Sequence, residues 1–505
     1  MRFHATIMPL LKELLISTPG AHIFGADTLN IKAVNYDSRE VSPGSAFVCI
    51  KGVATDGHQF APAAVERGAT VIVAENLELI AQIPENITKV IVPDTRRALA
   101  MMAAEFYGHP SREMVLVGIT GTNGKTTVAH LVADLLRESG YKSVGIIGTL
   151  GAKAEKTYYD TGRTTPESLD LQRLLADFLD GGSEAVVMEV SSHALALQRV
   201  AGCAFDAGIF TNLTQDHLDF HGEMDEYFAA KTRLFTDVAR ESEQFKSFGA
   251  VFNVDDHYGR QLLDLAADAP FITYGIEAEA HVKAEAVHLS AAGTSFVART
   301  SAGDIPFDVS LTGRFNVSNA LAAIAFGLLK EMPPTQIQAA MQRAKAPEGR
   351  MEVIDEGQDF YVAVDYAHTP DGLKNVLATV KEFTRGRLIC VVGCGGDRDR
   401  TKRPQMGAIT AGLADISIIT SDNPRTEDPS RIIEDVLAGT SGSHSQIEVE
   451  IDRRKAIERA IDLAEKGDFV LIAGKGHETY QIFKERTIHF DDREVVREAL
   501  EHLKS

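Results

Sequence analysis

The stretch VLVGITGTNGKTT, residues 115–127, decides the fold that the sequence predicts. Its apolar first half is typical of a buried strand, and apolar residues at positions 128, 131, 132, 135 and 136 predict a helix directly afterwards. Between them, Gly121 and Gly124 allow the backbone to approach a phosphate, and the helix N-terminus adds positive partial charge. The stretch therefore predicts a nucleotide triphosphate site; a plain strand-to-helix turn is the alternative.

One residue of this loop departs from the usual phosphate-binding pattern, because Ile119 stands where the first glycine is expected. The Gly-Lys-Thr core remains. Lys125 can reach the outer phosphates, and the Thr126 hydroxyl can ligate Mg²⁺.

Composition limits the classes of function. The chain has 505 residues, 44% hydrophobic and 24% charged, which predicts an ordinary globular protein of about three domains. A net charge of −20 argues against a nucleic-acid partner. Neither a signal peptide nor an apolar run of 18 residues is present, so we expect a cytoplasmic protein without membrane insertion. The four cysteines form no CxxC pair, which favours reduced thiols over a zinc site or disulfides.

The order of apolar strands and helices predicts an α/β protein with three domains. Residues 1–110 are predicted to form a small α/β domain. Residues 111–345 are predicted to form a central domain of the P-loop ATPase type with a mostly parallel sheet. Residues 346–505 read as a doubly wound, Rossmann-like domain. Ligands of such sheets bind at the carboxyl ends of the strands, where the candidate site residues lie.

The central domain offers a candidate metal site. Glu189 ends an apolar strand, where an unpaired buried carboxylate is costly, and His217 follows the next strand. Together with Thr126 they are candidate Mg²⁺ ligands. Capping and loop hydrogen bonds are the alternative, since histidine is an uncommon ligand of Mg²⁺.

Lys231 lies on a predicted amphipathic helix. A solvated lysine is one interpretation. A partly buried lysine is the other, and burial would lower its pKa and free a nucleophilic amine.

Polar loops follow three strands of the third domain. One loop carries Arg398, and the second holds Asp422 and Arg425, so that together they suit a zwitterionic ligand with a carboxylate and an ammonium group. Gly474 and Glu478 follow the last core strand, where the glycine allows close approach and the acid can accept from an amine. Surface ion pairs and a turn chosen for its geometry are the alternatives.

Seven motifs jointly resemble the Mur ligases, which add amino acids to the peptide of the peptidoglycan precursor. They are GTNGKTT (121–127), EVSSH (189–193), DHLDFHG (216–222), GRFNVSNA (313–320) and DYAHTP (365–370), with DSR (37–39) and GKGHE (474–478) nearer the ends. The DNPR loop at 422–425 resembles the form that adds meso-diaminopimelate. The lysine-adding form and a folylpolyglutamate-synthetase-like ligase are the near alternatives, and a nucleotide-switched binding protein is the distant one.

The resemblance implies a ligase that uses ATP and Mg²⁺ to join meso-diaminopimelate to UDP-N-acetylmuramoyl-L-alanyl-D-glutamate through an acyl phosphate. It also implies that Lys231 takes up CO₂ and becomes a carbamate. A cytoplasmic monomer is expected, with no nucleic-acid partner.

Residue roles are implied as well. Lys125, Glu189, His217 and Lys231 would be catalytic, and Thr126, Glu189, His217 and the Lys231 carbamate would hold metal. The ATP-binding set is Gly121, Thr122, Asn123, Gly124, Lys125, Thr126, Thr127, Asn316 and Arg350. The UDP-muramoyl-peptide set is Ser38, His58, Gln59, Thr164, Thr165, Ser191 and Arg199. The diaminopimelate set is Arg398, Asp422, Asn423, Pro424, Arg425, Gly474 and Glu478.

Overall fold

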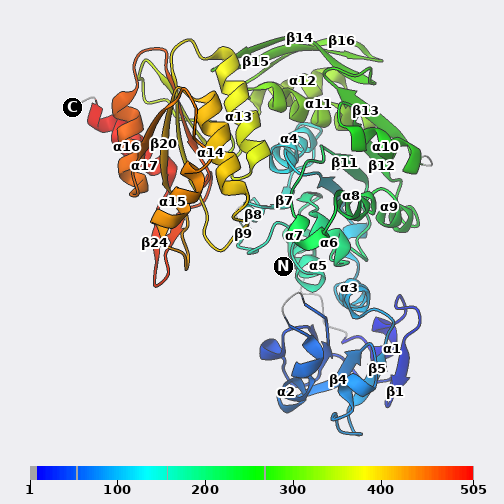
Figure 1. Ribbon diagram of the computed structural model, residues 1–505. Coiled ribbons are helices and arrows are strands. Elements are labelled where there is room, and N and C mark those ends of the chain that lie inside the picture. Colours follow the sequence, from blue (N-terminus) through cyan, green and yellow to red (C-terminus); the bar gives the residue numbers. More distant parts are fainter. Residues whose placement is uncertain (1–7, 53–54, 156, 267–268, 504–505) are drawn as a thin grey trace.

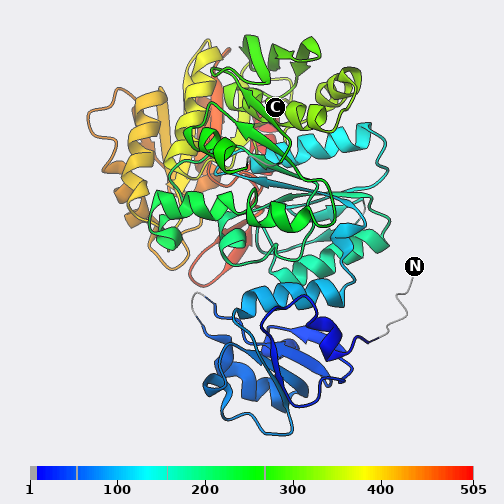
Figure 2. The same cartoon turned by 90° about the vertical axis from the view of Figure 1, so that its right-hand side faces the viewer.

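The structure, a computed structural model, describes residues 8–52, 55–155, 157–266 and 269–503. Three large sheets follow one another along the chain and belong to three α/β domains, which confirms the predicted fold class (Figure 1). Figures 1 and 2 both show the N-terminal domain below the other two. Within the described ranges, no helix is long and apolar enough to cross a bilayer.

The N-terminal domain has a five-stranded sheet in the order β1-β5-β4-β3-β2, parallel except where β1 pairs with β5. Alternate residues of β4 face opposite sides: Val71 packs with α1 and α3, and Ile72 packs with α2. The elements are α1 (Leu11–Leu14), β1 (His22–Phe24), β2 (Ala33–Asn35), η1 (Ser38–Glu40), β3 (Ser45–Val48), η2 (Gly57–Phe60), α2 (Ala61–Glu66), β4 (Ala69–Ala74), η3 (Glu78–Ile80), β5 (Thr88–Ile91) and α3 (Thr95–Phe106).

The central domain has an eleven-stranded sheet in the order β16-β15-β14-β13-β12-β11-β6-β10-β7-β8-β9. Six parallel pairings run from β14 to β7, and helices cover both faces of this middle part. The strands are β6 (Val115–Thr120), β7 (Val144–Gly148), β8 (Gly151–Ala154), β9 (Thr157–Tyr159), β10 (Ala185–Glu189), β11 (Ala207–Phe210), β12 (Gly249–Asn253), β13 (Phe271–Gly275), β14 (Val282–Ser290), β15 (Gly293–Thr300) and β16 (Gly303–Val309).

Antiparallel strands extend this sheet at both ends, β8–β9 at one edge and β15–β16 at the other. These edge strands are additional to those that the sequence predicts. The available signal was the alternation of apolar and polar residues in β16, where Ile305, Phe307 and Val309 are buried between exposed neighbours. The helices are η4 (Pro110–Arg112), α4 (Lys125–Glu138), α5 (Ser168–Asp180), α6 (Ser192–Ala196), α7 (Leu218–His221), α8 (Met224–Thr232), α9 (Asp237–Ser242), α10 (His257–Leu265), α11 (Arg314–Leu329) and α12 (Pro334–Arg343).

The C-terminal domain has a six-stranded sheet in the order β17-β18-β22-β19-β20-β21, parallel except for β17. Helices α13–α15 cover one face and α16–α17 the other, as a doubly wound sheet requires. The elements are β17 (Glu352–Val353), β18 (Tyr361–Asp365), α13 (Pro370–Phe383), β19 (Leu388–Cys394), α14 (Lys402–Leu413), β20 (Ile416–Ser421), α15 (Pro429–Leu437), β21 (Gln446–Val449), α16 (Arg453–Leu463), β22 (Phe469–Ala473), β23 (Tyr480–Ile482), β24 (Thr487–His489) and α17 (Asp492–Leu503).

The four cysteines are all described, buried and unpaired. Burial raises the pKa of the Cys203 thiol to about 12, so this side chain stays protonated at neutral pH. The prediction of reduced thiols is confirmed.

Candidate active site

The loop after β6 has the strand–turn–helix geometry that the sequence predicts. Gly121 (φ +148°) and Gly124 (φ +84°) adopt backbone conformations that favour glycine. A Cβ at Gly124 would lie 2.3 Å from Asn319 Oδ1, and one at Gly121 would lie 1.9 Å from Thr211 Oγ1. Both positions therefore require glycine, and the loop leads directly into the 14-residue helix α4.

Two lysines converge on this loop. Lys125 Nζ donates to the Gly121 carbonyl oxygen at 3.0 Å, and Lys231 Nζ donates to the same oxygen at 2.8 Å. Two lysine side chains beside one carbonyl oxygen repel each other when both are protonated. An anion is the natural ligand there, since it would offset both charges.

Lys231 is fully buried on α8, with only 1% of its surface exposed, so the solvated interpretation is wrong. Burial lowers the pKa of Lys231 well below its usual value, and repulsion from Lys125 lowers it further. The fold therefore buries Lys231 and favours its neutral, nucleophilic amine form.

Glu189 ends β10 and is 2% exposed. Its carboxylate accepts from Thr126 Oγ1 at 2.9 Å, and from the backbone N–H and hydroxyl of Thr149 at 3.0 and 3.1 Å. These direct partners are neutral, so the buried charge has room for a cation. Thr126 and Glu189 are brought together as the metal hypothesis requires, and Thr149 is a contact that sequence reasoning missed.

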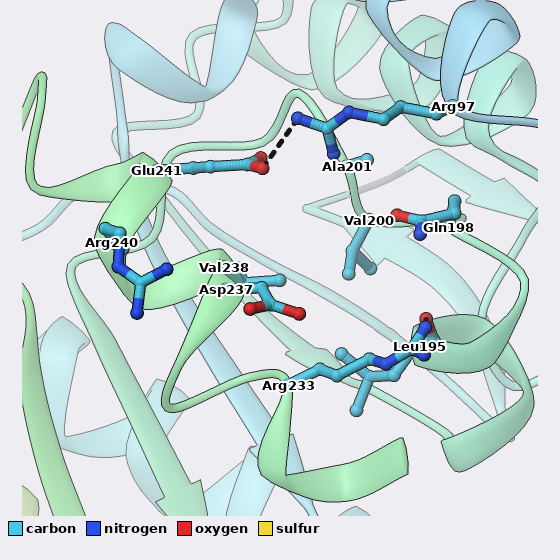
Figure 3. Close-up of a pocket in the computed structure, with 10 residues that line it drawn as sticks. All are labelled: Arg97, Leu195, Gln198, Val200, Ala201, Arg233, Asp237, Val238, Arg240 and Glu241. Carbon is cyan, nitrogen blue, oxygen red and sulfur yellow. Dashed lines mark hydrogen bonds and ion pairs between the residues drawn. The ribbon is translucent and has the colours of Figure 1, made fainter. Parts of the chain in front are cut away.

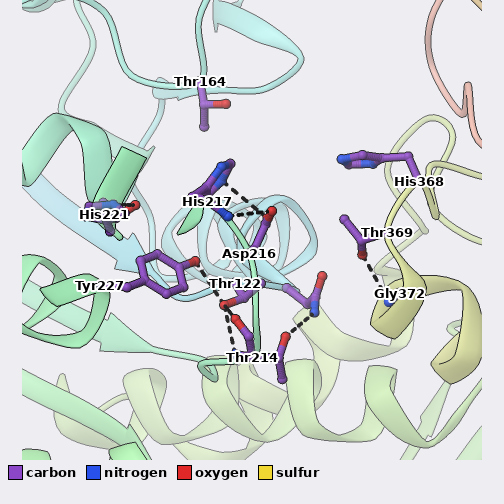
Figure 4. A network of polar contacts seen from close by, with 12 residues as sticks. Thr122, Thr164, Thr214, Asp216, His217, His221, Tyr227, His368, Thr369 and Gly372 are labelled. Atoms are coloured by element: carbon purple, nitrogen blue, oxygen red, sulfur yellow. Dashed lines mark hydrogen bonds and ion pairs between the residues drawn. The ribbon is translucent and has the colours of Figure 1, made fainter. Parts of the chain in front are cut away.

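His217 follows β11, and its ring lies 6.1 Å from that of Tyr227 between centroids. It adopts a left-handed conformation (φ +55°), and its Nε2 is 3.3 Å from Asp216 Oδ2. Figure 4 shows its loop beside Thr122 and Tyr227 and facing His368 of the C-terminal domain. Burial lowers the pKa of His217, which keeps the imidazole neutral and able to bind metal. Among the described residues, no three His, Cys, Asp or Glu side chains form a metal cluster by themselves.

The two remaining ATP candidates lie at different distances from the loop. Asn316 is buried on α11 and is linked to the loop through Asn319: its Oδ1 accepts from Asn319 Nδ2 at 2.9 Å, and Asn319 packs against Gly124. Arg350 comes from the C-terminal part of the chain and lies within 3.4 Å of Thr126 Oγ1. Its buried Nε has no hydrogen-bond partner among the described residues, so the guanidinium has capacity for a ligand.

The muramoyl-peptide candidates of the central domain form one connected group. Thr165 Oγ1 donates to the Glu189 carbonyl oxygen at 2.9 Å, and Ser191 N–H donates to Thr165 Oγ1 at 3.0 Å. Arg199 Nη1 donates to the Thr165 carbonyl oxygen at 3.1 Å. Thr164 lies one step further out, with its hydroxyl 3.2 Å from that of Thr149.

Glu167 is the centre of a cationic cluster that sequence reasoning missed. Its buried carboxylate lies 3.3 Å from Arg199, 3.4 Å from Arg96 and 3.8 Å from Arg163. A cavity of about 330 Å³ lined by Tyr36, Arg163 and Glu167 opens between the N-terminal and central domains. Three guanidiniums surround this one carboxylate, and Arg173, Asp160 and Asp170 also line the cavity, which therefore offers charged partners of both signs.

The candidates of the N-terminal domain lie in two loops. Ser38 begins η1 beside Tyr36, and Gln59 is exposed on η2. His58 points inward instead: its Nδ1 is 2.6 Å from Asp56 Oδ1, and its Nε2 accepts from Glu75 N–H at 3.4 Å. The His58 side chain therefore holds its loop in shape.

In the C-terminal domain, a buried lysine joins the predicted acidic residues. Lys475 Nζ donates to Asn423 Oδ1 and to Glu478 Oε2, both at 3.1 Å, and lies 3.6 Å from Asp422 Oδ1. Gly474 (φ +117°) passes close to Asp422, since a Cβ there would lie 2.9 Å from Asp422 Oδ2. Lys475 belongs to the GKGHE motif at 474–478, and its place among these acidic residues is visible only in the structure.

The two arginines of this region differ in how firmly they are held. Arg425 has a left-handed backbone (φ +54°) that is tied to β23 by its N–H bond to the Ile482 carbonyl oxygen. Arg425 directly follows Pro424, and its Nη1 donates to the Gly396 carbonyl oxygen at 2.8 Å. Arg398 is exposed and bonds only locally, to the Asp397 carbonyl oxygen. Arg425 is therefore the pre-positioned cation of the pair.

A smaller cavity of about 160 Å³ lies elsewhere on the boundary between the N-terminal and central domains (Figure 3). Arg97 of α3 pairs with Glu241 of α9 beside it at 2.7 Å. None of the candidate site residues lines this cavity.

Comparison with known proteins identifies the family. The Mur ligase family catalytic-domain model matches residues 30–107, the middle-domain model matches 119–327, and the glutamate ligase domain model matches 349–476. The chain belongs to the Mur ligase family. Relatives of this Mur ligase include a Geobacillus thermodenitrificans protein, 46% identical over 97% of this chain and 99% of its own, and a Clostridium botulinum protein, 46% identical over 94% and 96%. Both are named UDP-N-acetylmuramoyl-L-alanyl-D-glutamate–2,6-diaminopimelate ligase.

Solved structures agree with this assignment. A structure of a protein with the same name superposes on this Mur ligase with a TM-score of 0.71 and 32% identity, covering 99% of this chain and all of the other. A Mycobacterium tuberculosis folylpolyglutamate synthase, 18% identical, matches 75% of this chain with a TM-score of 0.59 and shares the fold alone.

Proposed function

We propose that this chain is an ATP-dependent ligase that joins meso-2,6-diaminopimelate to UDP-N-acetylmuramoyl-L-alanyl-D-glutamate in the cytoplasm. The observation that carries this proposal is the pairing of a cationic phosphate loop with a zwitterion site in the C-terminal domain, where Arg425 and Asp422 lie on one loop. Near-full-length relatives at 46% identity carry that activity in their names. The proposed domains are 1–110 for the UDP-sugar, 111–345 for ATP and 346–505 for the amino acid, and each large sheet falls within one of them.

The substrates divide among the candidate groups. The loop 121–127, with Arg350 and Asn316 behind it, binds the ATP phosphates. Ser38, Gln59 and the group around Thr165 and Arg199 hold the UDP-muramoyl-peptide across the cavity between the first two domains. Asp422, Asn423, Glu478 and Arg425 hold diaminopimelate, with Arg398 at the exposed edge.

The reaction must make a carboxylate reactive toward an amine in water. The glutamyl carboxylate attacks the γ-phosphorus of ATP, the bond to ADP breaks, and an acyl phosphate forms. The neutral amine of diaminopimelate then attacks the acyl carbon, and phosphate and a proton leave. Lys125 stabilises charge that develops on the phosphoryl oxygens.

Two further groups fit the site. Thr126 and Glu189, with His217 opposite, would hold Mg²⁺, which supplies charge neutralisation on the phosphates. The Lys231 amine, kept neutral by burial, would attack CO₂ and lose a proton to give a carbamate. That anion would offset the positive charge of Lys125, which shares the Gly121 carbonyl oxygen with Lys231.

One assay tests the proposal against its rivals. Phosphate release is measured with ATP and UDP-N-acetylmuramoyl-dipeptide, with diaminopimelate, lysine or glutamate added in turn, and the peptide product is weighed by mass spectrometry. We expect phosphate release and a lengthened peptide when diaminopimelate is the added amino acid, and neither when it is lysine or glutamate. Release that is independent of any amino acid would indicate a nucleotide-switched protein, and dependence on lysine or glutamate would indicate the other ligases.

A further inference from the structure

One carboxylate of the C-terminal domain reaches the phosphate loop. Asp371 lies in the first turn of α13, and its Oδ2 accepts from Asn123 Nδ2 at 3.0 Å and from Thr214 Oγ1 at 3.0 Å. These partners are 248 and 157 residues away in sequence and belong to the loops that follow β6 and β11. A third donor, Asn375 Nδ2 at 3.2 Å, comes from the same helix.

The two loops that Asp371 joins are already fixed to each other. Asn123 N–H donates to Asn212 Oδ1 at 2.9 Å, and Thr214 N–H donates to Thr122 Oγ1 at 3.0 Å. The first loop cradles phosphate in the proposed function, and the second leads to His217. A shift of Asp371 would therefore act on both loops at once.

Packing fixes where Asp371 stands. Thr369 caps α13 by accepting from Gly372 N–H at 3.2 Å, a contact visible in Figure 4. The buried face of α13, including Leu373, belongs to a cluster that also contains Ala291 from the central domain. The start of α13 thus moves with the C-terminal domain as that domain docks on the central one.

We propose that Asp371 is a positioning residue that couples docking of the C-terminal domain to the phosphate loop. This inference rests on the proposed function, which puts the nucleotide and the amino acid on different domains. A contact that joins these two domains makes each ligand strengthen the binding of the other. A carboxylate is suited to this task, since hydrogen bonds to an ionised acceptor are stronger than neutral ones. An ordinary interdomain contact would add stability but no coupling between ligands.

The test is a linkage measurement by titration calorimetry. The affinity for a non-hydrolysable ATP analogue with Mg²⁺ is measured with and without saturating diaminopimelate, and with UDP-N-acetylmuramoyl-dipeptide present throughout. The wild-type protein is expected to bind the analogue about fivefold or more tightly when diaminopimelate is present, the lower end of usual coupling strengths. Asp371→Ala should reduce that ratio to below about twofold, while Asp371→Asn, whose amide oxygen still accepts, should restore at least half of it.

The matched control is Asn375→Ala, which removes the donor on the exposed side of α13 and should leave the coupling ratio at the wild-type value. Circular dichroism confirms that each variant is folded. A wild-type ratio near one, or a full ratio in Asp371→Ala, overturns the inference and leaves the proposed function intact. A wild-type protein that binds neither ligand overturns both.

Discussion

At the scale of single residues, Arg425 shows how specificity can depend on one side chain. Among the described residues, its hydrogen bonds run through the backbone N–H and Nη1, which leaves Nε and Nη2 for a ligand. Diaminopimelate differs from lysine by one distal carboxylate, and a guanidinium left unpaired by lysine costs about 1–3 kcal/mol.

Replacing that guanidinium should affect one substrate only. Arg425→Ala is expected to raise the KM for diaminopimelate about tenfold or more and to change the KM for ATP less than about twofold. Steady-state kinetics with each substrate varied in turn measures both. Arg431→Ala, which removes an exposed arginine of the next helix, is the control. Equal changes in both KM values would contradict the assignment.

Lys231 predicts a pH dependence of stability. Because its pKa is lowered in the folded state, the folded protein binds fewer protons here than the unfolded chain below the ordinary lysine pKa of about 10.4, and wild-type stability rises with pH in that window. In CO₂-free buffer, Lys231→Met should therefore stabilise the protein at pH 6, and the gain should shrink toward pH 9. Thermal unfolding at both values measures this.

The control for that series is Lys374→Met, which changes an exposed lysine of α13 and should give the same small difference at both pH values. A Lys231→Met effect that does not depend on pH would mean that the amine is not neutral in the folded protein.

At the scale of elements, one buried arginine joins α14 to the loop and helix that follow β20. Arg403 is fully buried and donates to Glu427 Oε1 at 2.7 Å and to Asp435 Oδ2 at 2.9 Å. Its Nη2 also donates to the Gly395 carbonyl oxygen at 3.2 Å, in the loop next to Arg425. The substrate loops of the C-terminal domain are thus supported from behind by an ion-pair network.

The pH dependence of this network has the opposite sign from that of Lys231. Hydrogen bonds from Arg403 lower the pKa of Glu427 to about 2, so its stabilisation is present above about pH 4.5 and is lost as the pH falls toward 2. Glu427→Gln is expected to cost about 1–3 kcal/mol at pH 7 and clearly less at pH 3, measured by urea unfolding. Glu434→Gln, at an exposed position of α15, should cost little at either pH. An equal cost of Glu427→Gln at both values would refute the ion pair.

At the scale of the whole molecule, the central domain is held on two sides. Tyr36 OH donates to Asp170 Oδ2 at 2.6 Å from the N-terminal domain, and Arg350 and Asp371 reach the phosphate loop from the C-terminal side. Arg96 and Arg97 add ion pairs across the first boundary, to Glu167 at 3.4 Å and to Glu241 at 2.7 Å.

The Tyr36 contact predicts a substrate-specific effect, because it borders the cavity proposed for the UDP-linked peptide. Tyr36→Phe should raise the KM for that substrate about fivefold, from the loss of about 1 kcal/mol, and leave the KM for diaminopimelate unchanged. Tyr274→Phe is the matched control, since its hydroxyl donates within the central domain to the Phe210 carbonyl oxygen at 3.2 Å and Tyr274 does not line that cavity. Parallel changes in both KM values would point to a general loss of stability.

Much of this molecule follows from sequence patterns that act over short distances. The apolar run before Gly121, the two glycines and the helical spacing after them define strand, loop and helix without any distant contact. The same holds for the polar loops after β19, β20 and β22, because parallel strands put their carboxyl ends at one edge. The antiparallel strands β15 and β16 were harder to recognise, because their alternating polar and apolar residues lack the continuous apolar run that marks the parallel strands.

By itself, the sequence determined which chemical groups stand at strand ends and therefore which ligands the domains suit, since local spacing controls both. Only the tertiary structure decided that Lys125 and Lys231 share one carbonyl oxygen, that Lys475 joins Asp422 to Glu478, and that Asp371 meets Asn123. The physical reason is that burial and long-range contacts depend on how sheets and helices pack. The sequence around an aspartate or a glutamate does not show which distant residues will contact its carboxylate.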